Sequence, residues 1–239
     1  DKIIYSLNDE EKTAKVISND ETEEVIIIPP TFTYESQEYT VTSIGKHCLR
    51  NTHVDTYLPG DPIYRSSFTE IIIPSSIKEL DEGWCEATPR LSKVTISPEN
   101  PYFKMYNDEF IIGKSTKEQE KYDVLVFCIR NIDIVNIPDF IEIIGPYSFD
   151  DCRKITKFIF PKESKLKIID RFGLANLRID NITFPSSLCE FREGWCDSIV
   201  NLVDIEISPE NPYFKTYKGE FIIGKSTKEQ ENFDVLVFC

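Results

Sequence analysis

Alanine, methionine and histidine are scarce in this chain of 239 residues. It has three alanines, one methionine and two histidines, whereas isoleucine occurs 33 times. Because alanine favours helices and β-branched side chains fit pleated strands, this composition predicts a mostly β protein. The histidines, His47 and His53, have no cysteine or carboxylate at zinc-site spacing. We therefore expect no metal site and no catalytic Ser-His-Asp or Cys-His arrangement.

Positive charge is also deficient. The chain has 27 Lys and Arg against 41 Asp and Glu, a formal net charge of −14. An acidic surface repels phosphate, which argues against nucleic-acid binding and against anionic membranes. No apolar run approaches the roughly 18 residues of a membrane helix, so we expect no membrane insertion in this span. The first residues, DKIIYSLNDEEK, lack the basic start and apolar stretch of a signal peptide.

The seven cysteines follow no paired pattern. Their number is odd and no C-x-x-C occurs. We predict mostly reduced thiols, with disulfides as the alternative if the protein is secreted.

A long internal repeat is the strongest signal in the sequence. Residues 97–128 and 208–239 match at 27 of 32 positions with an offset of 111, and the match continues backwards from PSSIKELDEGWC to PSSLCEFREGWC. A shorter repeat lies inside it, in which a proline follows an apolar strand at steps of 24, 40, 23, 24 and 24 residues. The 40-residue step is one short repeat plus a 16-residue insert. Such periods indicate a solenoid, because a unit this short cannot bury its apolar face alone.

Each short repeat predicts one strand with a buried face. In ITKFIFP, LVDIEIS and LSKVTIS, positions one, four and six are apolar and the positions between them are mostly polar. After the proline, each repeat has two apolar residues that are 11 positions apart. A third apolar residue lies five positions after the first of these. We expect that position to form a buried internal column, occupied by Leu49, Cys85, Phe149, Leu174 and Cys196.

The string IPDFIEIIGPYSFDDCRKI, from Ile137 to Ile155, resembles the BspA-like leucine-rich repeat family. The insert NPYFKMYNDEFIIGKSTKEQEKYDVLVF is similar to the hairpins that members of this family place between repeats. The resemblance covers most of residues 25–239, although Leu80 and Phe191 begin pairs that depart from the usual Ile-Gly. It implies a leucine-rich repeat solenoid with a parallel β-sheet, short turns or 3-10 segments and two inserted β-hairpins. It also implies a surface or secreted protein of bacteria or trichomonad-type protists that adheres to host cells or matrix.

The expected organisation is a single repeat domain behind a small cap. Residues 1–24 predict a capping hairpin, because two strand-like segments flank the polar turn at Asn8. Residues 25–239 form the solenoid, with hairpin inserts near 99–128 and 210–239. The final DVLVFC is strand-like, so we expect the repeat sequence to continue past Cys239.

Residues 219–226 satisfy the pattern G-x-x-x-x-G-K-[ST] of a phosphate loop. The middle of this segment is Phe-Ile-Ile, which favours a strand, and the other copy has Asp108 in place of Gly219. A phosphate loop needs a flexible backbone followed by a helix. A nucleotide hydrolase is therefore the weaker interpretation, and we expect no cofactor.

Outward side chains of successive strands predict a grid on the concave face of the solenoid, where a protein ligand would bind. Three isoleucines, Ile72, Ile134 and Ile159, are expected to form an apolar stripe on this face; the alternative is a partly covered sheet surface. The predicted face consists of Glu70, Ile72, Lys93, Thr95, Ile134, Asn136, Lys157, Ile159, Asn181, Thr183, Asp204 and Glu206.

The sequence thus predicts a non-enzymatic protein-binding module with no catalytic residues. Its expected place is the cell surface or the secreted fraction, where it adheres to host cells or extracellular matrix. An intracellular scaffold or regulatory domain in the cytoplasm is the alternative, and a purely structural spacer is another. The identity of the partner and the oligomeric state stay open.

Overall fold

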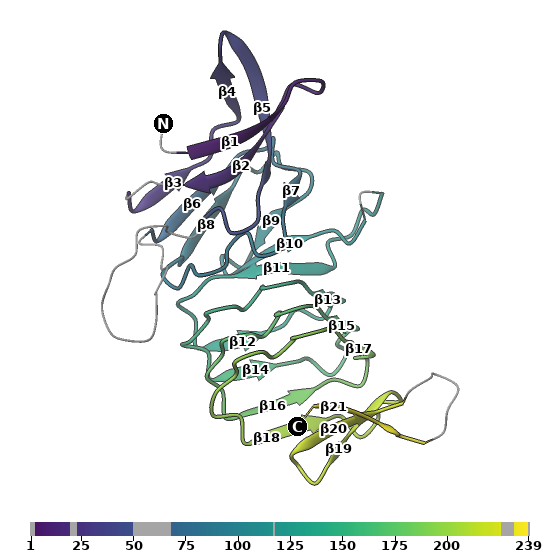
Figure 1. The fold of residues 1–239 in the computed structure, drawn as a ribbon. Helices are drawn as coiled ribbons and strands as arrows, with labels where there is room; N and C mark the ends of the chain where they lie inside the picture. Colours follow the sequence, from purple (N-terminus) through teal and green to yellow (C-terminus); the bar gives the residue numbers. More distant parts are fainter. Residues whose placement is uncertain (1–2, 20–22, 50–67, 117, 226–231, 239) are drawn as a thin grey trace. The chain divides into compact units, whose positions relative to one another are not determined.

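The computed structural model describes residues 3–19, 23–49, 68–116, 118–225 and 232–238 (Figure 1). The chain divides into two compact units, unit 1 with residues 1–119 and 127–131, and unit 2 with residues 120–126 and 132–239. The described residues of both units form strands and turns without any helix. The predicted mostly β solenoid with parallel sheets and two inserted hairpins is confirmed.

Unit 1 contains two sheets and one inserted hairpin. One sheet has the order β3-β6-β8 and is parallel. The other has the order β1-β2-β5-β4, with β7 added parallel to β5. The hairpin pairs β9 with β10. The strands are β1 (Ile3–Asn8), β2 (Thr13–Asn19), β3 (Val25–Ile27), β4 (Thr31–Tyr34), β5 (Gln37–Ile44), β6 (Glu70–Ile73), β7 (Glu79–Leu80), β8 (Lys93–Ile96), β9 (Lys104–Tyr106) and β10 (Phe110–Gly113).

Unit 2 repeats the same plan. Parallel pairs β12–β14 and β16–β18 lie along one side, and β13, β15 and β17 pair in parallel on the other (Figure 1). Strand β11 (Val124–Cys128) contributes Val124 and Leu125 to the second sheet by pairing with β13. The remaining strands are β12 (Ile134–Asn136), β13 (Ile143–Ile144), β14 (Lys157–Ile159), β15 (Ile168–Ile169), β16 (Asn181–Phe184), β17 (Glu190–Phe191), β18 (Asp204–Ile207), β19 (Phe214–Tyr217), β20 (Phe221–Gly224) and β21 (Val235–Phe238).

The predicted internal column is buried at four of its five positions. Leu49 and Cys85 are buried in unit 1, and Phe149 and Leu174 are buried in unit 2. Adjacent coils of unit 2 are joined in register, since the Phe149 N–H donates to the C=O of Gly173 at 3.0 Å. Cys196 differs from the expectation, because it is only partly buried and lines an open pocket.

The coils turn at two backbone positions that recur in several of the described copies. The first has positive φ at His47, Tyr147 and Phe172, and at Gly83 and Gly194. Positive φ is strained for most L-residues but free for glycine. Of the three copies that lack Ile-Gly, two have a glycine at this position, Gly83 and Gly194, and the third has Phe172. A Cβ on Gly194 would also lie 2.7 Å from the ring of Phe172.

The second recurring position lies four residues further on, at Ala87, Asp151, Asn176 and Ser198. Between these positions the chain closes single turns, such as the one in which the Asp150 N–H donates to the C=O of Tyr147 at 3.1 Å. The short connections expected as turns or 3-10 segments are single turns of this kind in the described residues.

A buried asparagine ties each inserted hairpin to the preceding coil. The side-chain NH₂ of Asn100 donates to the C=O of Pro74 (3.1 Å) and Ile77 (2.9 Å). Its Oδ1 accepts the N–H of Tyr102 and of Phe103, both at 2.9 Å. Asn211 repeats all four bonds in unit 2, with Pro185, Leu188, Tyr213 and Phe214. The Asn-Pro-Tyr-Phe motif is thus a structural joint.

The second hairpin also covers part of the edge of β18. The hydroxyl of Thr216 accepts the N–H of Ile207 at 2.9 Å and donates to the C=O of Ile205 at 3.2 Å. The other copy has Met105 at this position, and a thioether cannot donate a hydrogen bond. This is one of the five sequence differences between residues 97–128 and 208–239.

We propose that the β1–β2 hairpin caps unit 1. Its strand β2 pairs in parallel with β5, and Ala14 and Val16 are buried. Deleting residues 1–24 exposes the apolar edge of β5, so we expect the unfolding temperature to fall by about 5 °C or more and the soluble fraction to decrease. Thermal unfolding and size-exclusion chromatography of the deleted chain test this. Unchanged behaviour would contradict the capping role.

Candidate functional site

The outward side chains of unit 2 form two short rows. Ile134 lies beside Lys157 in one row, and Asn136 lies beside Ile159 in the other. The rows continue on β16 and β18, where Asn181 pairs with Asp204 and Thr183 with Glu206. All eight side chains are exposed. We call this surface the outer face of unit 2.

Two exposed isoleucines stand diagonally on the outer face of unit 2. Ile134 is 44% exposed and Ile159 is 39% exposed. Because they belong to different rows on neighbouring strands, their separation suits one apolar side chain of a partner placed between them. Polar groups surround them, including the hydroxyl of Thr183, which donates to Glu206 at 3.2 Å.

The three isoleucines of the expected stripe belong to two units. Ile72 belongs to unit 1, where it is only partly exposed and pairs with Ile27 of β3, which is 60% exposed. Each unit therefore presents its own pair of isoleucines. Glu70, Lys93 and Thr95 complete the outward side chains of β6 and β8, and Lys93 forms an ion pair with Glu70 at 3.0 Å.

A hollow of about 420 Å³ opens beside Ile159 at the ends of β14 and β16. The partly exposed ring of Phe160 lines it, stacked on Phe158 at 6.3 Å and lying 5.9 Å from Phe184. Lys162 and Glu210 stand among the lining residues. An aromatic wall with charged groups at its rim suits an apolar anchor residue of a protein partner.

Val25, Ile27 and Phe160 are surface residues that the sequence prediction missed. The strand-then-proline pattern at VIIIPP was sufficient to place Val25 and Ile27 outward, in register with Glu70 and Ile72. No sequence signal distinguishes Phe160, because Phe184 stands in the same place before a proline and is buried. That it borders a hollow depends on the packing of the next coil.

The second sheet of unit 2 presents paired charges instead of apolar groups. Glu142 accepts from Lys167 at 2.6 Å, and Asp170 accepts from Arg192 at 2.6 Å. The hydrogen bond that Lys167 donates to Glu142 raises the pKa of Lys167, and the one that Arg192 donates to Glu190 raises the pKa of Arg192. Salt screens such exposed pairs. This sheet therefore differs in character from the outer face, where Ile134 and Ile159 are exposed.

The described cysteines are thiols and form no disulfide, as predicted. Four are buried, and burial raises the pKa of Cys48 to about 12, which makes it a weak nucleophile. His47 contacts Glu86, and His53 lies outside the described residues. The described residues contain no group of three or more His, Cys, Asp or Glu that could hold a metal ion.

The phosphate-loop pattern falls on a hairpin. Gly219 has a φ of 72° in the turn before β20, and Phe221 to Gly224 form β20 itself, paired antiparallel with β19. A strand with regular ladder bonds cannot turn its N–H groups toward a phosphate. Ser226 lies outside the described residues. The segment is an inserted hairpin over its described length.

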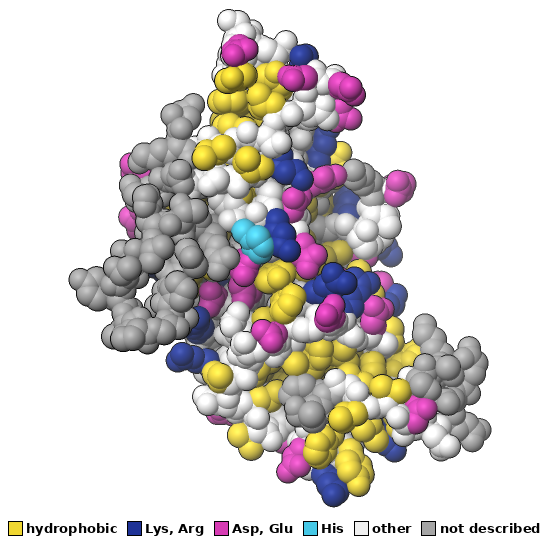
Figure 2. All heavy atoms as spheres, in the orientation of Figure 1, with side chains coloured by type: hydrophobic (Ala, Val, Ile, Leu, Met, Phe, Trp, Pro, Cys, Tyr) yellow, Lys and Arg dark blue, Asp and Glu magenta, His cyan; other side chains and the backbone are white. Residues whose placement is uncertain are grey.

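The surface mixes both signs of charge with scattered apolar side chains. Figure 2 shows hydrophobic side chains gathered where unit 2 carries β18 to β21. Val203 there is 79% exposed and Leu236 is 58% exposed.

Within the described ranges, no helix has the length and apolar character needed to cross a membrane.

Solved structures of bacterial leucine-rich repeat proteins share this fold. A leucine-rich cell surface protein from Faecalibacterium prausnitzii is 15% identical, with a TM-score of 0.51, over 95% of this chain and 57% of its own. A leucine-rich repeat protein from Eubacterium ventriosum is 16% identical, with a TM-score of 0.52, over 70% of this chain and 40% of its own. This chain therefore spans little more than half of the first protein and less than half of the second. No curated protein sequence matches it.

Part of this chain also matches the sequence model of a protein family. The BspA type leucine rich repeat region matches residues 123–221 in six copies. This range covers the coils of unit 2, with their parallel strands and their buried column at Phe149 and Leu174. Residues 123–221 therefore match a leucine-rich repeat region of the BspA type.

Proposed function

We propose that this chain is a non-enzymatic protein-binding module that adheres to host cells or extracellular matrix at a cell surface. The observation that carries the proposal is the outer face of unit 2. Exposed Ile134 and Ile159 stand there beside an aromatic hollow, and charged and polar groups surround them. Apolar anchors within a polar rim are the usual composition of a protein contact. The Faecalibacterium neighbour is a cell surface protein, which supports the location.

Replacing the two isoleucines with aspartate tests the proposal. We expect the double variant Ile134→Asp, Ile159→Asp to lose binding about tenfold or more, because each carboxylate would be desolvated at the contact. Binding is measured on a panel of purified matrix proteins and on intact host cells. Both side chains are exposed, so the unfolding temperature should not change.

The matched control is Ile17→Asp on β2. Ile17 is 45% exposed, close to the exposure of the two test residues, but it belongs to unit 1. This variant should bind as the original chain does. Equal binding by the double variant and the control would contradict the assignment of the face, and failure of the original chain to bind any surface would contradict adhesion.

The intracellular alternative has its own support. The described cysteines are reduced, and four are fully enclosed, which suits a reducing compartment. Protease treatment of intact cells separates the two locations. Digestion of the protein on intact cells supports the surface assignment, whereas protection until lysis supports an intracellular scaffold.

A further inference from the structure

Strand β4 is an open edge strand of unit 1. It is the last strand in the sheet with the order β1-β2-β5-β4, and β5 is its partner among the described strands (Figure 1). Natural edge strands usually carry a charged side chain, a proline or a bulge, which prevents pairing with another chain. The sequence of β4, Thr-Phe-Thr-Tyr, has no charge and no proline, and its register with β5 is unbroken. The strand therefore lacks the usual protection, and its aromatic and β-branched residues favour pairing.

The backbone groups of Thr31 and Thr33 point away from β5. Residues of an antiparallel ladder alternate between hydrogen-bonded and non-hydrogen-bonded pairs. The N–H of Thr40, which lies opposite Thr31, donates at 2.9 Å to the C=O of Lys12 on its other side. Thr31 is therefore in a non-hydrogen-bonded pair, and so is Thr33 two residues later. Within the described ranges, no residue forms a hydrogen bond with the outward N–H and C=O groups of these two threonines.

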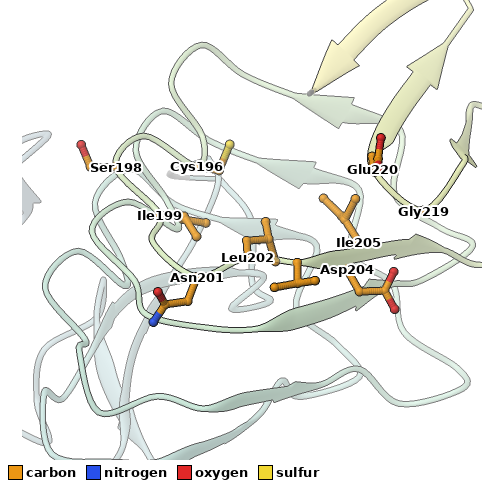
Figure 3. A pocket seen from close by; sticks show the side chains of 10 residues that line it. Cys196, Ser198, Ile199, Asn201, Leu202, Asp204, Ile205, Gly219 and Glu220 are labelled. Carbon is orange, nitrogen blue, oxygen red and sulfur yellow. The ribbon is translucent and has the colours of Figure 1, made fainter.

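An edge in unit 2 is protected, in contrast to that of β4. The inserted hairpin that contains Glu220 lies against the strand that contains Ile205 (Figure 3). Thr216 of this hairpin occupies the N–H of Ile207 and the C=O of Ile205. Strand β4 has no such cover among the described residues.

The open edge is complementary to itself. When a second copy runs antiparallel with Phe32 opposite its own Phe32, each Thr31 comes opposite Thr33 of the other copy. Each such pair exchanges two hydrogen bonds, so this register uses every outward backbone group of both threonines with a partner inside β4. The two Phe32 side chains then form a non-hydrogen-bonded pair, in which side chains approach most closely.

The side chains of β4 suit this contact. Phe32 is partly exposed, and its ring is stacked on Tyr5 with the centroids 4.3 Å apart. A second Phe32 adds an aromatic cross-strand contact beside this pair. Each copy has a formal net charge of −14, so a contact between copies is favoured where no carboxylates face each other. The pairs of this register are Thr with Thr and Phe with Phe, which are uncharged.

We propose that two copies of this chain associate through β4, antiparallel, with Phe32 opposite Phe32 and Thr31 opposite Thr33. The partner at this edge is thus a second copy, and the two sheets become one continuous sheet. Because β4 is only four residues long, the dimer dissociates on dilution.

Sedimentation of the whole chain over a wide range of concentration tests the association. We expect the average mass to rise toward twice the monomer mass as the concentration increases. Thr33→Pro removes the outward N–H of both copies but none of the bonds to β5, so it should weaken association about tenfold or more. The matched control is Thr33→Ser, which keeps the N–H and should associate as the original chain does. A monomer at all concentrations, or equal association by the proline variant, would overturn the proposal.

Single cysteine variants test the register without depending on the proline variant. In the proposed dimer the Cα atoms at position 32 are about 4.5 Å apart, within the range of about 4.4 to 6.8 Å that a disulfide needs. Phe32→Cys should therefore form a covalent dimer under mild oxidation. Tyr34→Cys is the control, because Tyr34 is 50% exposed but lies about 13 Å along the strand from its counterpart.

We expect dimer formation by Phe32→Cys to be about fivefold faster or more than by Tyr34→Cys. The original chain gives the background rate of its own cysteines. Equal rates for the two variants, or a rate for Phe32→Cys no higher than this background, would overturn the proposed pairing.

Discussion

Replacing Asn100 with alanine should lower the free energy of unfolding of unit 1 by about 3 to 5 kcal/mol. The Asn100 side chain is 5% exposed and makes four hydrogen bonds to backbone groups of two segments. Alanine would leave two carbonyls and two N–H groups without these partners, and each unsatisfied buried group costs about 1 to 3 kcal/mol before relaxation. The hairpin would also lose its attachment to the coil that contains Pro74 and Ile77.

Urea unfolding followed by circular dichroism measures this effect. Asn211→Ala should give a similar loss in unit 2, since the same four bonds recur there. The control is Glu99→Ala, because Glu99 is an exposed neighbour of Asn100. If both asparagine variants lost less than about 1 kcal/mol of unfolding free energy, water would be replacing the hydrogen bonds. That result would contradict the structural role given to Asn100 and Asn211.

Replacing Phe184 with alanine should cost about 3 to 5 kcal/mol in unit 2. Phe184 is 1% exposed, and its ring lies 5.3 Å from Phe191 and 5.6 Å from Trp195. Removing it leaves a cavity at a junction of rings from successive coils. Such a cavity collapses only partly in a closely packed core.

The Phe184 prediction is checked by the same urea unfolding. Phe184→Leu keeps most of the buried volume and should cost clearly less. Tyr217→Ala removes an aromatic ring that is 50% exposed and should change stability little. If all three variants had the same stability, Phe184 would not be a central part of the core of unit 2.

The strands and their directions could be predicted from the sequence because each is defined locally. A proline after an alternating apolar segment identifies a strand and the side chains that point inward, as Phe158 does between Lys157 and Ile159. Parallel pairing follows from stacking identical coils. For the same reason, the outward position of every residue in the predicted face agrees with the registers found. Its role in binding stays a prediction.

Features that depend on contacts between distant segments could not be predicted. Asn100 and Asn211 read as polar turn residues, and their burial results from the turn of the preceding coil closing over them. The closure of Cys85 depends on Arg130, 45 residues away. Likewise, the exposure of Cys196 and the division into two units follow from packing, which the repeat pattern alone does not specify.

The Thr216 hydroxyl has a consequence for self-association. Open sheet edges recruit strands from other molecules, and this is how many β proteins polymerise. A recruited strand would bond to the C=O of Ile205 and the N–H of Ile207. Both groups already form hydrogen bonds with the Thr216 hydroxyl. Growth of a fibril from this edge would first have to displace the threonine. Met105, at the corresponding position of the other hairpin, has no hydroxyl that could form these two bonds.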